Sequence, residues 1–357
     1  MSDAEFSGTM AVAEEQRFDV PALERYLIEH VPGFRGPLQV RQFRGGQSNP
    51  TFLLRAADGA QYVLRKQPGG PLLPSAHAVD REFRVISALN GTGFPVARPV
   101  CLCEDRSVIG TLFYVMGYAA GRNFWDPTLP DLSAQERAAV YDEMNRVLVG
   151  LHTLDFARAG LADYGKPGQY VERQVARWTK QYRASQTEVI EAMDRLIEHL
   201  PRHIPPGEET SLVHGDYRLD NVIFHPREPR ILAVIDWELS TLGAPLVELA
   251  YLAMRWRMPA DGFRALGGLD LARLEIPGEA EFVADYCARR GREQVAPRVW
   301  AYYLAFNLFR LAAILQGVLA RALQGNASSA HALEAGRRAR AVAELGWRIG
   351  RESFEGG

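Results

Sequence analysis

The sequence predicts an α+β protein with a small, strand-rich N-terminal lobe and a larger, mostly helical C-terminal lobe. Residues 38–116 hold short runs of β-branched and aromatic residues separated by turn signals, which is typical of strands. From Ser133 onward, apolar residues recur at helical spacing over long segments. Strands followed by helices favour this fold class. We therefore expect a loose tail at residues 1–17, an N-lobe at 18–120 and a C-lobe at 121–357.

The composition limits the class of protein. The 357 residues are 47% hydrophobic and 24% charged, as in ordinary soluble globular proteins. Lys and Arg total 41 against 43 Asp and Glu, so no bulk positive field favours nucleic acid or an anionic membrane as a partner. Three cysteines are too few for a disulfide framework, which fits a reducing, cytoplasmic setting. The N-terminus carries acids where a signal peptide needs basic residues.

Turns and one longer helix divide the strand-rich lobe. Asp19 and Pro21 predict the start of a short helix that continues to about residue 30. Asp58 and Gly59 form a hairpin signal between two strands. The other elements expected here are strands at 51–54, 61–66, 100–103 and 108–116 and a helix at 75–89.

The C-terminal lobe begins with a capping-box spacing at Ser133 and Glu136. Its most apolar run, residues 300–320, is interrupted by polar side chains, so a buried helix is favoured over a membrane span. Further helices are expected at 169–200, 245–257, 279–290, 298–323 and 330–350.

A hairpin with apolar strands at 221–225 and 231–236 interrupts these helices. It delivers Asp216, Asn221 and Asp236 to one end of a short ribbon. Gathering such groups costs free energy unless a cation or a reacting group lies between them. The oxygens of Asn221 and Asp236 suit Mg²⁺, and Asp216 is able to accept a proton from a hydroxyl nucleophile. The simpler alternative is that these residues only cap turns.

Glu82 lies inside the apolar stripe of the 75–89 helix. A carboxylate on a buried face needs a cationic partner. Arg65 and Lys66, on the preceding strand, are the candidates, and alternation allows only one of them to point at this helix. A kink that leaves Glu82 in solvent is the alternative interpretation.

The Gly-rich turn at residues 45–49 lies between two strands. Its backbone N–H groups, at Gly46 and Ser48, are candidates for covering phosphates. Most Gly-Gly turns serve only to reverse the chain, so this motif gains weight only from its position two strands before the candidate cation.

Four motifs, in this order, resemble the aminoglycoside-phosphotransferase and kinase-like family. Y-V-L-R-K resembles the strand with the phosphate-binding cation, and D-R-E-F-R the start of the helix with its ion-pair Glu. V-H-G-D-Y-R-L-D-N resembles the catalytic loop, and I-D-W-E the metal-binding segment. The resemblance covers roughly residues 35–325. It implies a protein-kinase-like, two-lobed fold with an antiparallel sheet in the N-lobe, and ATP (or GTP) with Mg²⁺ bound between the lobes.

The resemblance also implies a role for each residue of the catalytic segment. Asp216 would be the catalytic base, and Asn221 and Asp236 would be the Mg²⁺ ligands. Arg218 lies two residues after Asp216, where related kinases place a cation that steadies the γ-phosphate.

The N-lobe would bind the rest of the nucleotide. Glu82 would hold the cation on the α- and β-phosphates. We favour Arg65 over Lys66, because that register places Val63 on the same face, over the adenine. The linker whose backbone pairs with adenine would be residues 113–118, and it includes Met116 and Tyr118.

The chain departs from the family pattern after Asp236. Relatives often read G-D-P-L-x-D-L-A, where this chain has Ala244 in place of the first Asp and Glu248 in place of the second. Both positions usually brace the catalytic loop. We expect an altered brace and an intact site, while a nucleotide-binding pseudokinase with a regulatory role stays open.

The acceptor is predicted to be a small molecule with a hydroxyl group. The pattern is most similar to the kinase-like domain fused to some acyl-CoA dehydrogenases, which implies a hydroxyacyl compound or its CoA thioester. The helix from residue 299 to 324 has no Asp or Glu, and Tyr303, Asn307 and Arg310 share one face of it. These residues form a candidate acceptor wall with one cation, or simply a core helix.

Other acceptors remain as alternatives. Aminoglycosides are polycations that need acidic walls, so a helix without acids lowers the weight of a drug-resistance kinase. Choline, homoserine and a protein side chain stay open. Against a protein acceptor, only a short segment separates Asp236 from Pro245. The sequence does not determine the oligomeric state.

Overall fold

The computed structural model describes residues 8–44, 49–69, 77–260, 264–324 and 332–354. Within it the chain forms two compact units. The sheet unit comprises Met1–Leu129, Asp155–Ala162 and Arg218–Ser240, and the helical unit comprises Pro130–Leu154, Asp163–Tyr217 and Thr241–Gly357. The division therefore differs from a single expected boundary after residue 120, because two later segments join the sheet unit.

The sheet unit is built on a six-stranded antiparallel sheet with the strand order β1-β2-β3-β4-β6-β5. The central strand β4 is paired on both sides, with β3 and with β6. Arg65, near the end of β4, is thereby held by two neighbouring strands. The strands are β1 (Thr9–Met10), β2 (Gln39–Phe43), β3 (Thr51–Arg55), β4 (Gln61–Lys66), β5 (Pro99–Cys103) and β6 (Phe113–Gly117).

The edge strand β1 corrects the expectation of a loose tail at residues 1–17. Residues 1–7 lie outside the described part, but Thr9 and Met10 pair with β2. The side-chain oxygen of Gln42 also accepts a hydrogen bond from the backbone of Ala13 at 2.9 Å. A short 3₁₀ helix, η2 (Glu14–Gln16), comes next in the chain. The segment is ordered by long-range backbone pairing, for which two residues carry no sequence pattern.

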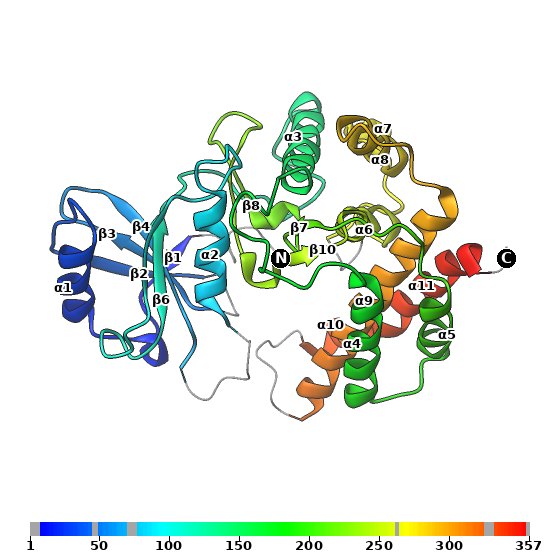
Figure 1. The fold of residues 1–357 in the computed structure, drawn as a ribbon, viewed down its shortest axis with the longest axis horizontal. Helices are drawn as coiled ribbons and strands as arrows, with labels where there is room; N and C mark the ends of the chain where they lie inside the picture. Colours follow the sequence, from blue (N-terminus) through cyan, green and yellow to red (C-terminus); the bar gives the residue numbers. More distant parts are fainter. Residues whose placement is uncertain (1–7, 45–48, 70–76, 261–263, 325–331, 355–357) are drawn as a thin grey trace. The chain divides into compact units, whose positions relative to one another are not determined.

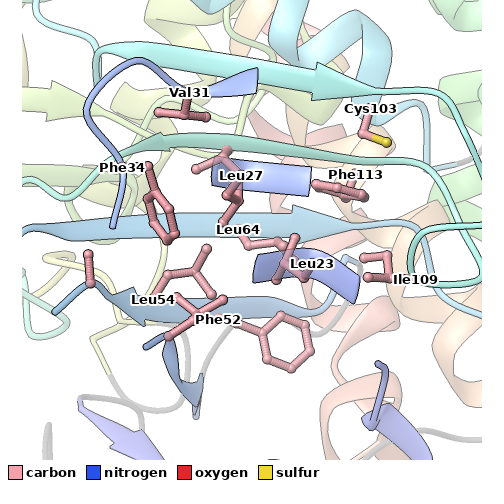
Figure 2. Close-up of a cluster of buried hydrophobic side chains, with 13 residues drawn as sticks. Leu23, Leu27, Val31, Phe34, Phe52, Leu54, Leu64, Cys103, Ile109 and Phe113 are labelled. Carbon is pink, nitrogen blue, oxygen red and sulfur yellow. The ribbon is translucent and has the colours of Figure 1, made fainter. Parts of the chain in front are cut away.

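Two helices cover the two faces of this sheet (Figure 1). Helix α1 (Val20–His30) begins where the Asp19 carboxylate accepts a hydrogen bond from the Ala22 backbone N–H, as the sequence predicts. Its Leu23 and Leu27 pack with Phe52 and other strand residues in the apolar core of Figure 2. Helix α2 (Val79–Leu89) lies on the opposite face. The predicted start at Ser75 lies outside the described residues.

The predicted hairpin is present and explains why residues 218–240 belong to the sheet unit. Strands β8 (Val222–Phe224) and β9 (Ile231–Val234) pair with each other. They attach to the sheet unit through bridges from Val96 to Val234 and from Arg122 to Phe224. Gly121 lies so close to this hairpin that any Cβ there would overlap the Phe224 carbonyl. Two 3₁₀ helices flank the hairpin in the chain, η4 (Leu219–Asn221) before it and η5 (Trp237–Leu239) after it.

The helical unit is arranged around its longest helix, α9 (Pro297–Leu323), which packs against α4, α5, α6, α10 and α11 (Figure 1). Helix α3 has the capping box that Ser133 and Glu136 predict. A two-stranded ribbon of β7 and β10 carries the chain to the catalytic-loop motif. The other elements are α3 (Ala134–His152), α4 (Tyr170–Ser185), α5 (Glu191–His199), η3 (Leu200–Arg202), β7 (Ser211–Val213), β10 (Thr241–Gly243), α6 (Pro245–Arg257), α7 (Leu271–Leu274), α8 (Glu279–Arg289), α10 (Ala332–Arg337) and α11 (Ala339–Phe354).

The prediction of one helix over residues 169–200 is wrong, because α4 ends at Ser185 and α5 begins at Glu191. Gln316, on α9, donates hydrogen bonds to the Ser185 carbonyl at 3.3 Å and to the Thr187 hydroxyl at 2.5 Å. These tertiary contacts hold the break. Residues 330–350 likewise divide, into α10 and α11.

One described helix, α9, is long and apolar enough to cross a membrane by length and composition. In this structure, 67% of its most apolar window is buried inside the protein. A core helix passes the same test of composition, and the contacts of α9 with five other helices are those of a core helix.

Candidate active site

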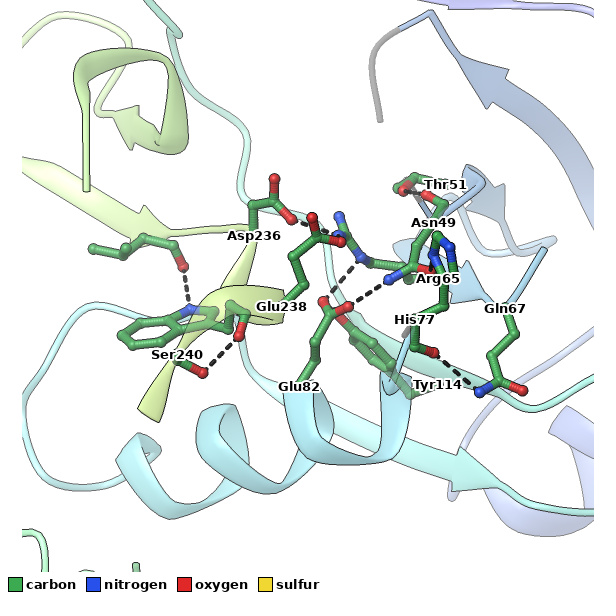
Figure 3. Close-up of polar contacts among 12 residues, drawn as sticks. Asn49, Thr51, Arg65, Gln67, His77, Glu82, Tyr114, Asp236, Glu238 and Ser240 are labelled. Atoms are coloured by element: carbon green, nitrogen blue, oxygen red, sulfur yellow. Dashed lines mark hydrogen bonds and ion pairs between the residues drawn. The ribbon is translucent and has the colours of Figure 1, made fainter. Parts of the chain in front are cut away.

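Arg65 and Glu82 form an ion pair inside the sheet unit (Figure 3). The Arg65 Nε atom lies 2.9 Å from the Glu82 Oε2 atom, and the two side chains are 9% and 1% exposed. Arg65 reaches Glu82 because it projects from β4 on the face that α2 covers. Of the two candidate cations, Arg65 is the one that pairs with Glu82.

Two neutral side chains satisfy the Glu82 carboxylate further. The Asn49 amide donates to Oε1 at 2.7 Å, and the Tyr114 hydroxyl donates to Oε2 at 3.1 Å. Burial raises the pKa of Glu82, and Arg65 opposes that rise. A carboxylate with a cation and two hydrogen-bond donors is well enough paired to stay in a buried position.

Asp236 completes this network from the end of β9. Its backbone is left-handed, with a φ of 69°, which turns the chain immediately after the strand. The Arg65 Nη2 atom lies 2.5 Å from Asp236 Oδ1 and 3.6 Å from Glu238 Oε2. Burial by itself would lower the pKa of Arg65, but the carboxylates of Glu82 and Asp236 raise it above its ordinary value. The guanidinium therefore stays charged and joins the α2 carboxylate to the Asp236 carboxylate.

Lys66 points to the other face of the sheet. Its Nζ atom lies 3.2 Å from the Gln16 side-chain oxygen and 5.9 Å from the centre of the Phe52 ring. Burial lowers the pKa of this amine. The structure therefore does not bring Lys66 to the Glu82–Asp236 network.

Asn221 and Asp236 are brought to the same end of the β8–β9 hairpin. The Ile235 backbone N–H donates to the Asn221 carbonyl at 2.9 Å, directly before Asp236. The described residues contain no group of three or more His, Cys, Asp or Glu side chains arranged for a metal. An amide and a carboxylate fit Mg²⁺, which usually binds one or two carboxylates and completes its shell with water and phosphate.

Arg218, the other catalytic candidate near this hairpin, is paired with Asp220. The distance from Arg218 Nη1 to Asp220 Oδ2 is 2.9 Å. Arg218 is thus in the sheet unit with Asn221 and Asp236, and its proposed role on the γ-phosphate stays a prediction.

The candidate nucleobase residues lie on neighbouring strands. Val63 and Met116 are register partners on β4 and β6. Tyr118 comes after β6, is 37% exposed and stacks on Phe43 with a ring-centre distance of 6.5 Å. Gly46 and Ser48, the predicted phosphate-covering residues, lie outside the described part of the chain.

In the helical unit, Glu248 holds the backbone of the catalytic-loop motif. Its carboxylate accepts hydrogen bonds from the backbone N–H groups of His214 at 2.9 Å and Gly215 at 2.5 Å. It also lies 3.0 Å from His152 Nε2. The brace that the Asp-to-Glu departure put in question is therefore present. At the other departure, Ala244 precedes α6 and provides no side-chain cap.

His152 and Glu248 form a buried neutral–anionic pair. Burial lowers the pKa of His152. Burial would raise the pKa of Glu248, but its hydrogen bonds to His152 and His214 hold it below its ordinary value. His152 Nδ1 lies 2.7 Å from the Tyr286 hydroxyl, so the tautomer that fits has Nε2–H donating to Glu248.

Asp216 has a partner that the sequence reasoning missed. The Tyr251 hydroxyl, one turn after Glu248 on α6, donates to Asp216 Oδ1 at 2.5 Å. In the sequence, Glu248 and Tyr251 are three positions apart, which places them on the same face of a helix. That spacing does not show that this face packs against Asp216, which only the structure reveals.

The three candidate acceptor residues on α9 have structural contacts. Asn307 is fully buried, and its amide donates to the carbonyls of Val247 and Tyr303. It joins α6 to α9 in the buried core, which agrees with the alternative of a core helix at this residue. Tyr303 is 4% exposed, and burial raises its pKa to about 12. Arg310 is 9% exposed and donates to the Gly215 carbonyl at 3.1 Å.

The model of the phosphotransferase enzyme family matches residues 39–303, which is most of the chain. The chain belongs to this family. It has the protein-kinase-like fold of this family of phosphotransferase enzymes. The family prediction from the four sequence motifs is confirmed.

Two relatives are acyl-CoA dehydrogenase family members. Member 10 of Mus musculus is 48% identical over 95% of this chain and 31% of its own length. Member 11 of Rattus norvegicus is 44% identical over 97% of this chain and 45% of its own length. The chain thus spans less than half the length of either relative.

Solved structures agree with this assignment. A protein from Ralstonia eutropha, classed with the aminoglycoside phosphotransferases, is 52% identical, has a TM-score of 0.87 and covers 94% of this chain and 99% of its own. An aminoglycoside phosphotransferase in complex with ADP and hygromycin B has a TM-score of 0.59 at 18% identity and covers 92% of this chain and 99% of its own. The second likeness is one of fold alone.

Proposed function

We propose that this chain transfers the γ-phosphoryl group of ATP, with Mg²⁺, to the hydroxyl group of a small acylated acceptor. The observation that carries the proposal is the Arg65 guanidinium, which pairs with both Glu82 and Asp236. Burying a cation between two carboxylates costs free energy, so such a cluster is rarely kept without a function. Here Arg65 would supply a positive charge for phosphate, and Asp236 would supply a carboxylate ligand for Mg²⁺.

Each group has a role that its chemistry supports. ATP would supply the phosphoryl group, and Mg²⁺ would neutralise part of the negative charge on its phosphates. Asn221 and Asp236 would hold the cation through their oxygens, and Arg65 would hold phosphate oxygens while Glu82 keeps it in place. Asp216 would orient the acceptor hydroxyl and accept its proton. These tasks are positioning and charge neutralisation, on which phosphoryl transfer depends.

The intact brace at Glu248 supports an active enzyme over a pseudokinase. Glu reaches the N–H groups of His214 and Gly215, so the substitution of Asp by Glu leaves the catalytic-loop backbone held. The residues that the kinase reaction requires, Asp216, Asn221 and Asp236, are all present in the sequence.

An acylated acceptor is supported by two independent features. The relatives with 44% and 48% identity are named as acyl-CoA dehydrogenase family members, a name that refers to an acyl thioester. Helix α9 contains no Asp or Glu, so it offers no acidic wall for a polycationic aminoglycoside. We therefore favour a hydroxyacyl compound, free or as its CoA thioester, over an aminoglycoside.

The test is an ADP-release screen with ATP and Mg²⁺ against hydroxy acids, hydroxyacyl-CoA thioesters, aminoglycosides, choline and homoserine. We expect ADP release with a hydroxyacyl compound and a loss of orders of magnitude in kcat for Asp216→Asn. GTP replaces ATP in a parallel series to determine the donor. Near-normal turnover by Asp216→Asn would refute the mechanism, and binding of ATP without turnover on any hydroxyl would favour a pseudokinase.

A further inference from the structure

The Asp216 carboxylate is anchored by Tyr251. The Tyr251 hydroxyl donates to Oδ1 at 2.5 Å. The terminal torsion of an Asp side chain is broad, so a free carboxylate turns easily about its last bond. A hydrogen bond to one oxygen restricts that rotation and thereby sets the direction of the other oxygen. Proton acceptance in the reaction requires such a direction.

Arg310 holds both Tyr251 and the backbone next to Asp216. Its Nη2 atom donates to the Gly215 carbonyl at 3.1 Å. Its guanidinium carbon lies 5.3 Å from the centre of the Tyr251 ring and 5.6 Å from that of the Trp178 ring. The cation therefore lies within cation–π distance of two aromatic rings, and such contacts are stabilising and suit the planar guanidinium of Arg.

Together with Tyr251 and Arg310, Glu248 contacts three consecutive residues of the loop, 214–216. Glu248 binds the N–H groups of His214 and Gly215, Arg310 binds the Gly215 carbonyl, and Tyr251 binds the Asp216 side chain. Glu248 and Tyr251 lie one turn apart on α6, whereas Arg310 comes from α9. Two helices thus hold both the backbone and the carboxylate of the loop.

We propose that Tyr251 and Arg310 are positioning residues that fix the Asp216 carboxylate for phosphoryl transfer. Arg310 therefore acts through Tyr251 and Gly215 and is not the cation that binds the acceptor. Only 9% of Arg310 is exposed, and its guanidinium is already in contact with the Gly215 carbonyl and the Tyr251 ring. This inference rests on the proposed function, in which Asp216 is the base.

The test is steady-state kinetics of Tyr251→Phe, which removes one oxygen atom and keeps the ring under Arg310. We expect kcat to fall by roughly 10- to 100-fold while KM for ATP and for the acceptor changes by less than about twofold, since only the reacting geometry is lost. Tyr302→Phe is the matched control. The Tyr302 hydroxyl also donates a buried hydrogen bond, to the Leu200 carbonyl at 3.0 Å, but from α9 to a different part of the unit.

Arg310→Met separates positioning from acceptor binding. Loss of positioning lowers kcat with little change in acceptor KM, whereas loss of an acceptor cation raises that KM. Because both residues act on the same carboxylate, the double variant should lose less than the product of the two single losses. Thermal unfolding identifies any variant that fails to fold, and Tyr251→Phe, the smallest change, is then decisive.

The outcomes are distinct. A kcat for Tyr251→Phe equal to that of Tyr302→Phe, or a raised acceptor KM with unchanged kcat in Arg310→Met, overturns the inference while wild-type activity and the Asp216→Asn loss still stand. Absence of ADP release by the wild type with every acceptor overturns the proposed function and this inference together.

Discussion

Arg65 Nε lies 2.9 Å from Glu82 Oε2, and the same guanidinium reaches Asp236 Oδ1 at 2.5 Å. One buried side chain thus connects the central strand of the sheet, the α2 helix and the end of the β8–β9 hairpin. An Arg suits this position because its planar fork presents several donors at once, whereas a Lys ammonium is a single point charge.

The Arg65 network predicts a sharp difference between two neighbouring cations. Arg65→Met should lower kcat/KM for ATP by roughly 10²-fold, because phosphate loses its cation and Glu82 its partner. It should also lower the free energy of unfolding by about 3–5 kcal/mol, since a buried carboxylate is left unpaired. ADP-release kinetics and urea unfolding measure the two effects.

Lys66→Met is the control for that experiment. It removes a buried cation from the same strand, on the face away from Glu82. Its kcat/KM should stay within a few-fold of the wild type. Equal losses in the two variants would show that the strand, and not the Arg65 pairing, determines nucleotide affinity.

Asp236 predicts the dependence on metal. Chelation of divalent cations should abolish ADP release, and Asp236→Ala should lower kcat by orders of magnitude, because Mg²⁺ loses its carboxylate ligand. Asn221→Ala should mainly raise the Mg²⁺ concentration that gives half-maximal rate. Glu228→Gln, at the exposed turn of the same hairpin, is the matched control and should leave both quantities unchanged.

The buried His152–Glu248 pair predicts acid sensitivity. The folded-state pKa of His152 lies below its ordinary 6.5, so the unfolded chain binds the proton more readily and stability falls as the pH drops below about 6.5. The depressed pKa of Glu248 acts in the same direction below 4.5. Urea unfolding between pH 7.5 and 5 should show a slope of up to about 1.4 kcal/mol per pH unit from His152. The slope should shrink in His152→Gln, and an unchanged slope there would contradict the assignment.

Gly121 predicts a backbone requirement beside the hairpin. A Cβ at this position would overlap the Phe224 carbonyl, so Gly121→Ala should destabilise the sheet unit by about 1–3 kcal/mol, as overpacking does elsewhere. The control is Gly69→Ala, where a Cβ meets nothing within 4 Å. Differential scanning calorimetry compares the two, and equal unfolding temperatures would show that the hairpin moves aside at little cost.

Local patterns predicted much of the fold correctly. The Ser133 capping box, the helix over residues 245–257 and the hairpin around Pro226 are all present, because caps, helical period and turn residues act within a few positions of the chain. The same rules failed at residues 186–190. There the break in the helix is held by Gln316, from a helix more than 100 positions away in sequence.

By itself, the sequence predicted that a cation pairs with Glu82, that only one of Arg65 and Lys66 is able to do so, and that Asp216, Asn221 and Asp236 lie at one end of a hairpin. The tertiary structure decided which cation it is, because α2 covers one face of the sheet and α1 the other. It also decided that Tyr251 and Arg310 contact Asp216 and Gly215 and that Asn307 joins two helices. Such partners come from separate elements that meet only when the core packs, and no local period of the chain records that meeting.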